Sequence, residues 1–139
     1  MKRHPALRDL SSEHHQGLVL AKHIRQALAG ERTPGPDWAE VKAVFEASLE
    51  PHFRKEEADL LPALEAAGEG ELVARTRAEH EAMRRLVREG GPADLARFAQ
   101  LLTDHIRFEE RVLFQVAQER LPGFGGGSED RPPGGEGAS

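Results

Sequence analysis

A pattern of ten residues that combines histidine and glutamate occurs twice in this chain, over residues 52–61 and over residues 105–114. Both copies read as a histidine, an apolar residue, an arginine, any residue, two glutamates, two further residues and an apolar pair. A histidine and a glutamate four positions apart lie on one face of an α-helix, one turn from each other. Two side chains placed in this way can bind one metal ion, as in the zinc-binding HExxH motif. The repeat therefore indicates a site built from two halves.

The two motifs fall within four blocks in which apolar residues recur at helical spacing. The blocks cover about residues 5–29, 38–67, 71–89 and 92–121. Segments with glycine and proline separate them, and signals for β-strands are nearly missing. Four helices with short connections predict an all-α fold, an antiparallel up-down-up-down four-helix bundle.

Two stretches of the sequence depart from this regular helical pattern. Pro51 lies inside the second block, where a proline removes a backbone hydrogen bond and clashes with the preceding turn. We expect a kink there, with two shorter helices as the alternative. The bundle is expected to be one domain over residues 1–121. Residues 122–139 are rich in glycine, proline and polar residues, which predicts a disordered tail.

Each block directs one histidine onto its apolar stripe when successive residues are rotated by about 100° around the helix axis. These four histidines are His14, His52, His80 and His105. The same rule places Leu18 and Leu28 on the inner face of the first block and Val112 on that of the fourth.

The glutamates of the motif separate in the same way. Glu56 and Glu109, the first of each pair, point inward, whereas Glu57 and Glu110 point toward the rim. Asp59 also falls on the inner face and is a candidate to accept a hydrogen bond from an imidazole N–H.

Four histidines and two carboxylates buried without a counter-charge are costly, and a cationic centre removes that cost. Six ligands exceed one tetrahedral zinc site and suit two octahedral ions that share bridging carboxylates. Imidazole and carboxylate in a helical bundle indicate iron, with manganese or zinc as minor alternatives. The ferritin-like pattern is excluded, because none of the seven histidines has a glutamate three positions before it.

The Glu-His pairs at 13–14 and 79–80, together with HFRKEE and HIRFEE, resemble the hemerythrin-like HHE cation-binding family over about residues 5–121. The resemblance implies a hemerythrin-like bundle that holds two non-haem irons with an oxo or hydroxo bridge. Glu56 and Glu109 would bridge the two irons. Carried over residue by residue, the metal ligands are His14, His52, Glu56, His80, His105 and Glu109.

Two positions depart from the hemerythrins that carry O₂. Those proteins have a second histidine four residues before that of the third helix, where this chain has Thr76, and one iron would be more open as a result. They also place the carboxylate of the fourth helix five residues after its histidine, which here corresponds to Glu110 in place of Glu109. His15 is the reserve candidate for a further histidine ligand.

The resemblance implies a non-haem di-iron protein that binds or senses O₂ or a related small ligand such as NO. A di-iron enzyme is one alternative, acting in peroxide reduction, ferrous iron oxidation or repair of nitrosative damage, since an open position at a metal is where chemistry occurs. A structural bundle that stores a metal is another.

Composition limits the remaining possibilities. The chain has 139 residues, no cysteine and a formal net charge of −5. The absence of cysteine excludes disulfides and cysteine-ligated clusters, so histidine and carboxylate must hold any metal. The net negative charge gives no sign of a basic surface for nucleic acid. No apolar run approaches the roughly 18 residues of a membrane helix. We therefore expect a cytoplasmic protein.

Overall fold

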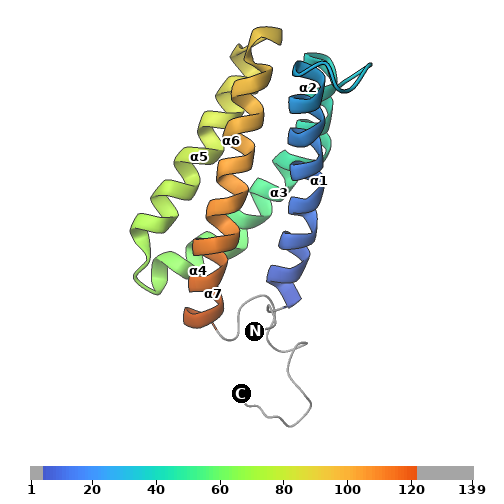
Figure 1. Cartoon of the computed structure of the whole chain (residues 1–139). Helices are drawn as coiled ribbons and strands as arrows, with labels where there is room; N and C mark the ends of the chain where they lie inside the picture. Colours follow the sequence, from blue (N-terminus) through green and yellow to red (C-terminus); the bar gives the residue numbers. More distant parts are fainter. Residues whose placement is uncertain (1–4, 122–139) are drawn as a thin grey trace.

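The computed structural model of the chain describes residues 5–121, and Figure 1 shows its helices. The first helix, α1 (Pro5–Leu28), and the third, α5 (Gly70–Glu89), are uninterrupted. The second helix, residues 38–66, consists of the consecutive segments α2 (Trp38–Val44), η1 (Phe45–Leu49), α3 (Glu50–Lys55), η2 (Glu56–Leu60) and α4 (Leu61–Ala66). The fourth helix, residues 95–120, follows the 3₁₀ turn η3 (Pro92–Asp94) and consists of α6 (Leu95–Phe108), η4 (Glu109–Leu113) and α7 (Phe114–Arg120).

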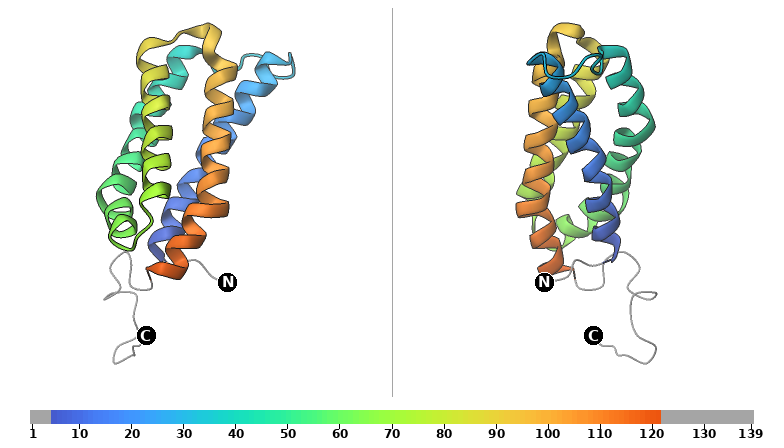
Figure 2. Two further views of the ribbon diagram at one scale, coloured as in Figure 1. Left: turned by 90° about the vertical axis from the view of Figure 1, so that its left-hand side faces the viewer. Right: turned by 45° about the vertical axis from the view of Figure 1, so that its right-hand side comes forward.

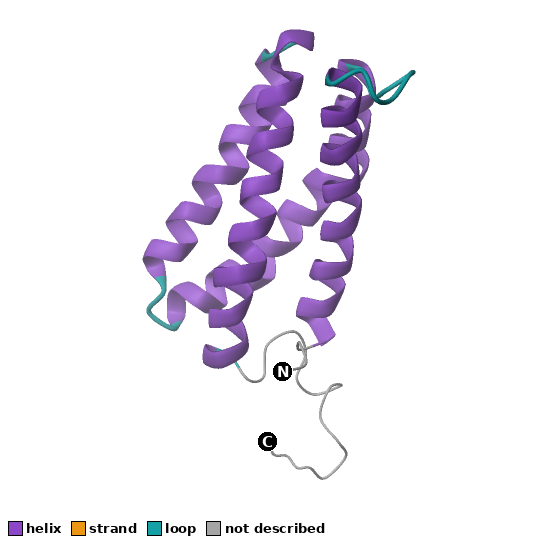
Figure 3. Cartoon of the chain, in the orientation of Figure 1, coloured by secondary structure: helices purple, strands orange, loops and turns teal. Residues whose placement is uncertain are grey.

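The four helices run alternately up and down and form an antiparallel bundle (Figures 1 and 2). Helix α6 packs against both α1 and α5, and α4 packs against α5. Between residues 5 and 121 there are helices and loops but no strand (Figure 3). The predicted all-α four-helix bundle is thus confirmed. None of the helices within that range is long and apolar enough to cross a membrane. The predicted tail, residues 122–139, lies outside the described residues.

The second helix continues through its prolines because a π-helical segment precedes each of them. Pro51 follows η1 and Pro62 follows η2, each as the second residue of the next α-helical segment. The backbone N–H of the residue after each π segment donates to the carbonyl five residues earlier, Glu50 to Phe45 and Leu61 to Glu56. This wider turn accommodates the proline ring and its missing N–H. The distortion expected at Pro51 takes this form, and the alternative of two separate helices is wrong.

The π segments η2 and η4 begin at Glu56 and Glu109, the equivalent glutamates of the two motifs. A π turn contains one residue more than an α turn, so the residues that follow are rotated relative to a regular α-helix. Asp59 is therefore exposed, and Val112 has 38% of its surface accessible, whereas Leu113 is fully buried. The inward positions predicted for Asp59 and Val112 are wrong for this reason.

The buried stripe of α1 is narrower than the sequence pattern predicts. Leu18 and Leu28, which were expected to face the core, are 36% and 54% exposed. Gly17 takes the inner position next to Leu18, and its neighbours across the core are side chains of the second and fourth helices.

The apolar core has two clusters, one on each side of a polar layer. One cluster includes Ile24, Trp38, Phe45, Phe98 and Leu102, and the other includes Leu7, Leu60, Leu64, Leu113 and Phe114. The buried polar residues of the layer are His14, His52, Glu56, Thr76, His80, Thr103, His105 and Glu109. The packing on both sides therefore holds this layer away from water at mid-height in the bundle.

Candidate metal centre

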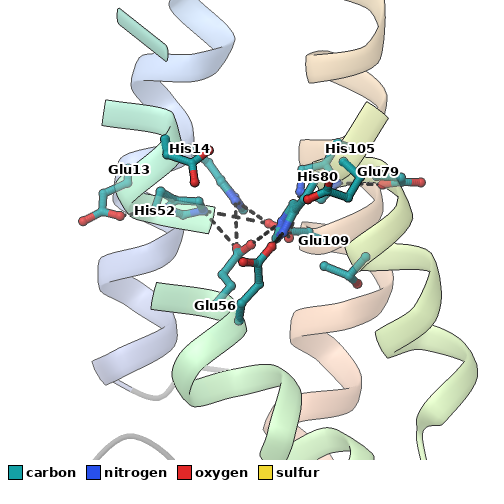
Figure 4. A network of polar contacts seen from close by, with 12 residues as sticks. Glu13, His14, His52, Glu56, Glu79, His80, His105 and Glu109 are labelled. Atoms are coloured by element: carbon teal, nitrogen blue, oxygen red, sulfur yellow. Dashed lines mark hydrogen bonds and ion pairs between the residues drawn. The ribbon is translucent and has the colours of Figure 1, made fainter. Parts of the chain in front are cut away.

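All six residues that the sequence analysis selected as metal ligands are buried and lie together (Figure 4). Each of the four helices contributes one histidine, and the second and fourth helices add Glu56 and Glu109. His15, the reserve candidate, is exposed and lies outside the cluster. Glu110, the alternative to Glu109, also lies outside it, with 31% of its side chain exposed.

The six residues form two groups of four potential ligands. His14 and His52 form the first group with the two glutamates, and His80 and His105 form the second group with the same glutamates. In each group the ligand atoms lie within 4.8 Å of one another. We call Glu56 and Glu109 the inner carboxylates.

Each inner carboxylate directs one oxygen toward each group. Oε2 of Glu56 lies 2.9 Å from Nε2 of His52, and its Oε1 lies 2.9 Å from Nε2 of His80. Likewise, Oε1 of Glu109 lies 2.7 Å from Nε2 of His14, and its Oε2 lies 2.9 Å from Nε2 of His105. Two carboxylates arranged in this way are able to bridge two cations.

Several atoms that face the centre have no hydrogen-bond partner. Among the described residues these buried atoms include Nε2 of His52 and His105 and Oε2 of Glu56 and Glu109. His52 and Glu56 are 2.9 Å apart, as are His105 and Glu109, yet neither pair has the alignment of a hydrogen bond. Buried polar atoms without partners are rare in native proteins and require an explanation. Cations between the histidines and carboxylates would satisfy all four atoms, so the donor set fits metal ions.

A second ring of glutamates fixes the histidines from outside. Nδ1 of each histidine lies within hydrogen-bond distance of one carboxylate, and we call these four glutamates the outer carboxylates. The distances are 2.7 Å for His14 and Glu110, 2.7 Å for His52 and Glu13, 2.7 Å for His80 and Glu57, and 2.6 Å for His105 and Glu79. Because an ionised carboxylate only accepts, each Nδ1 carries the proton. Nε2 is thereby directed to the centre, as in most metal-binding histidines.

The outer carboxylates are not predicted by the helical periodicity of the sequence. Periodicity predicts Glu57 and Glu110 at the rim, where the structure has them, but it predicts no partner for them. The carboxylate that accepts from an imidazole N–H at His52 is Glu13 and not Asp59. A signal was present in the repeat, since a glutamate directly precedes the histidine of the first and third helices and directly follows the inner carboxylate of the second and fourth.

Basic residues hold three of the outer carboxylates. Nζ of Lys55 lies 2.8 Å from Glu13, and Nε of Arg75 lies 2.9 Å from Glu79. Arg84 donates to both oxygens of Glu57, at 2.9 and 3.0 Å, and to Glu50 at 2.8 Å. These contacts place positive charge at the periphery and leave the negative inner carboxylates to the centre.

The protonation of the histidines reflects this concentration of carboxylates. Burial alone lowers the pKa of a histidine, but the neighbouring carboxylates Glu109 and Glu56 outweigh it and raise the pKa of His52 to about 11. Burial is likewise outweighed at His105, where Glu109 and Glu79 raise the pKa to about 10. Burial would raise the pKa of Glu109, but the histidines around it hold that pKa well below its usual range. The inner carboxylates thus require positive charge beside them, from protons or from metal ions.

Aromatic rings close two sides of the polar layer. Phe53 stacks on His80 with ring centroids 4.0 Å apart, and Phe114 stacks on His14 with centroids 5.2 Å apart. Thr76, at the place of the additional histidine of O₂ carriers, is fully buried and donates a 2.8 Å hydrogen bond to the carbonyl of Leu72. Its hydroxyl is therefore engaged with the backbone of its own helix.

Fold and site together define a class of protein: a four-helix bundle that binds metal cations through a buried cluster of histidine and glutamate. The hemerythrin HHE cation-binding domain matches residues 6–117, and the chain belongs to this family. No curated protein and no solved structure matches the chain. The resemblance seen in the sequence motifs is thereby confirmed at the level of the family.

Proposed function

We propose that this protein is a non-haem di-iron protein that binds O₂ or a related small ligand such as NO. The observation that carries the proposal is the shared pair of inner carboxylates, each with one oxygen in each four-ligand group. A single ion would use one group and leave the other group's histidines without a counterpart. Two ions use all the buried donor atoms.

The choice of iron follows from the donors. Four imidazoles and two carboxylates are of intermediate softness, and they leave a pair of divalent ions with two remaining positive charges. Iron held in this way supplies reversible electron transfer to a small oxygen- or nitrogen-containing ligand. The role of the chain is to keep each Nε2 in place through the outer carboxylates and to exclude water with Phe53, Phe114 and the apolar clusters.

Metal analysis tests the first part of the proposal. Purified protein loaded with ferrous iron under argon should retain about two irons per chain after desalting, and His52→Ala should lose a large part of that iron. Arg85→Met, a change at an exposed residue of α5, is the control and should retain the wild-type amount. Fewer than about one iron per chain in the wild type, with no further loss in His52→Ala, would contradict a metal site at these residues.

Stopped-flow spectroscopy tests the second part. Mixing the ferrous protein with O₂ should produce an absorption change that argon reverses over several cycles. A reversible absorption change is expected if O₂ enters and leaves the site without being consumed.

A di-iron enzyme is the second candidate, and Thr76 favours it. A threonine stands where O₂ carriers have a further histidine, and its hydroxyl is bonded to the backbone, so each four-ligand group keeps only two imidazoles and would leave positions for a substrate. Rapid, irreversible oxidation in the stopped-flow experiment, with consumption of added peroxide over many turnovers, would favour the enzyme over the binding protein.

A further inference from the structure

An open hollow of about 410 Å³ lies on the surface between α5 and the fourth helix. We call it the arginine hollow, and the residues that line it are Arg75, Asp104, Arg107, Phe108, Arg111 and Val112. Three of these residues are arginines and one is an aspartate. The hollow is therefore positively charged, although the chain as a whole has a formal net charge of −5.

Two of the three arginines have no partner within the described part of the chain. Arg107 and Arg111 are exposed, and neither guanidinium group forms an ion pair or a hydrogen bond with residues 5–121. Asp104, the carboxylate in the lining, accepts a 2.9 Å hydrogen bond from Gln100 instead. Like charges four residues apart destabilise a helix. A local feature that lowers stability without a counterpart inside the chain is typical of a functional surface.

The repeat of the ten-residue motif provides an internal comparison. Each copy has an arginine two residues after its histidine. Arg54 of the first copy donates to Glu50 at 3.0 Å, but Thr103 takes the place of that glutamate in the second half, and Arg107 has no such partner. The second copy also adds Arg111 where the first copy has an alanine. Because both copies place their inner ligands alike, the metal centre does not require this additional positive charge.

The third arginine connects the hollow to the metal centre. Arg75 lies over the ring of Phe108, with its guanidinium carbon 3.8 Å from the ring centroid. Its Nε lies 2.9 Å from Glu79, which in turn lies 2.6 Å from Nδ1 of His105 (Figure 4). Since Arg75 uses only Nε for Glu79, its two terminal nitrogens are left for a ligand in the hollow. A group bound to them would lie two hydrogen bonds from a candidate metal ligand.

From these observations we propose that the arginine hollow is a docking surface for a carboxylate-rich segment of a partner protein. A guanidinium group binds a carboxylate through two parallel hydrogen bonds, and it does so while stacked on an aromatic ring. Val112, which is 38% exposed, adds apolar surface beside the arginines. Arginine and aromatic residues are the types enriched at protein interfaces. The docking surface contains no metal ligand, so this inference does not depend on the proposed function.

The surroundings of the arginines favour protein carboxylates over ligands that carry phosphate. A nucleic acid backbone is a line of closely spaced negative charges and is bound by an extended basic surface. Here Asp104 and Glu79 border the arginines and would repel such a line of charges. The hollow is also open to water, where one small anion gains little from a single exposed ion pair.

Two labelled peptides test the proposal with the full-length chain. One peptide repeats Glu-Glu-Leu, and the other has glutamine in place of each glutamate. Fluorescence anisotropy at low ionic strength should show that the glutamate peptide binds at least about tenfold more tightly, because only its carboxylates pair with the arginines. Added salt should reduce this difference, since it screens exposed charges.

Paired substitutions locate the binding surface. Arg107→Gln together with Arg111→Gln should weaken binding of the glutamate peptide by at least about tenfold, because two charged contacts are lost. Arg77→Gln together with Arg85→Gln removes the same charge from exposed positions of α5 outside the hollow. This matched control should change the affinity by less than about twofold. Thermal melting establishes that both double variants are folded.

Each contrary outcome overturns a definite part of the proposal. Equal weakening in the two double variants would mean that the peptide responds to net charge and not to the arginine hollow. Equal binding of the two peptides to the wild type would overturn the carboxylate partner. Pyrophosphate or a DNA oligonucleotide that binds more tightly than the glutamate peptide, and only when Arg107 and Arg111 are present, would assign the hollow to a phosphate-bearing ligand instead. Iron content is measured separately, so a failure of docking and a failure of the metal centre are distinguishable.

Discussion

At the scale of single residues, the histidines of this site are fixed from both ends. One ring nitrogen of each donates to an outer carboxylate, and the other faces the inner carboxylates. A neutral imidazole has one donor and one acceptor nitrogen, so the outer contact decides which nitrogen is left to bind a metal. Adjacent glutamates such as Glu109 and Glu110 consequently have different tasks.

Paired substitutions distinguish these tasks. Glu109→Ala should remove most of the bound iron, because both ligand groups use this residue. Glu110→Ala should retain iron with an affinity lowered roughly 10- to 100-fold, as expected when the partner of a ligating histidine is lost. Competition with a chelator measures both affinities. A greater loss in Glu110→Ala than in Glu109→Ala would assign the ligand role to Glu110.

Arg84 has a structural role at the same scale. It is 17% exposed and donates to Glu50, Glu57 and Glu81, so it joins the second helix to α5. Arg84→Met keeps the apolar stem but should destabilise the metal-free protein by about 1–3 kcal/mol, the usual effect of losing hydrogen bonds to charged groups. Urea denaturation measures this change. Arg85→Met, its exposed neighbour, should stay within about 0.5 kcal/mol of wild type, and equal effects of the two variants would refute the role.

At the scale of the elements, the π segments are the features that helical periodicity could not predict. A constant rotation per residue correctly oriented His52, which lies between η1 and η2, His105, which precedes η4, and the inner carboxylates, which are the first residues of η2 and η4. The same rotation gave the wrong orientation for Asp59 and Val112, which lie inside η2 and η4, because a π turn contains one residue more than an α turn. The choice between an α and a π turn depends on contacts with other helices, which periodicity along one helix does not contain.

The π segments also determine the tolerance for proline. Pro62→Ala should change the free energy of unfolding by less than about 1 kcal/mol, because the π segment before it already accommodates the ring. Proline at Ala74, an exposed position in the regular helix α5, should cost about 3 kcal/mol or more. Thermal and urea denaturation of the two variants test the comparison. A similar loss in both would mean that the π segment has no such effect.

At the scale of the whole molecule, the fold followed from the four apolar blocks, and the inner ligands followed from the faces of those blocks. The contacts between the histidines and the outer carboxylates could not be predicted from helical periodicity, because they join distant parts of the chain. His14 and Glu110, for example, are 96 residues apart.

The whole buried layer should respond to pH as a unit. In the metal-free protein the pKa of His52 is raised from 6.5 to about 11 and that of His105 to about 10, so both rings are protonated at neutral pH. A metal ion must displace the proton on Nε2, and iron loading at pH 7 should therefore release about two protons or more per chain. Metal affinity should therefore rise with pH, because the proton that competes with the metal for Nε2 is lost only as the pH approaches the raised pKa of the histidine. Titrations in two buffers of different ionisation enthalpy count the protons, and an affinity independent of pH between 6 and 8 would contradict this reading.

The division of the ligands between the two halves of the bundle has a further consequence. The first and second helices supply His14, His52 and Glu56, and the third and fourth supply His80, His105 and Glu109. Neither half completes a four-ligand group, since each group takes one carboxylate from the other half. The short loop at residues 67–69 is thus a tether that gives each half a high effective concentration for the other. Because of this tether, metal ions held by the two groups would join the two halves of one chain.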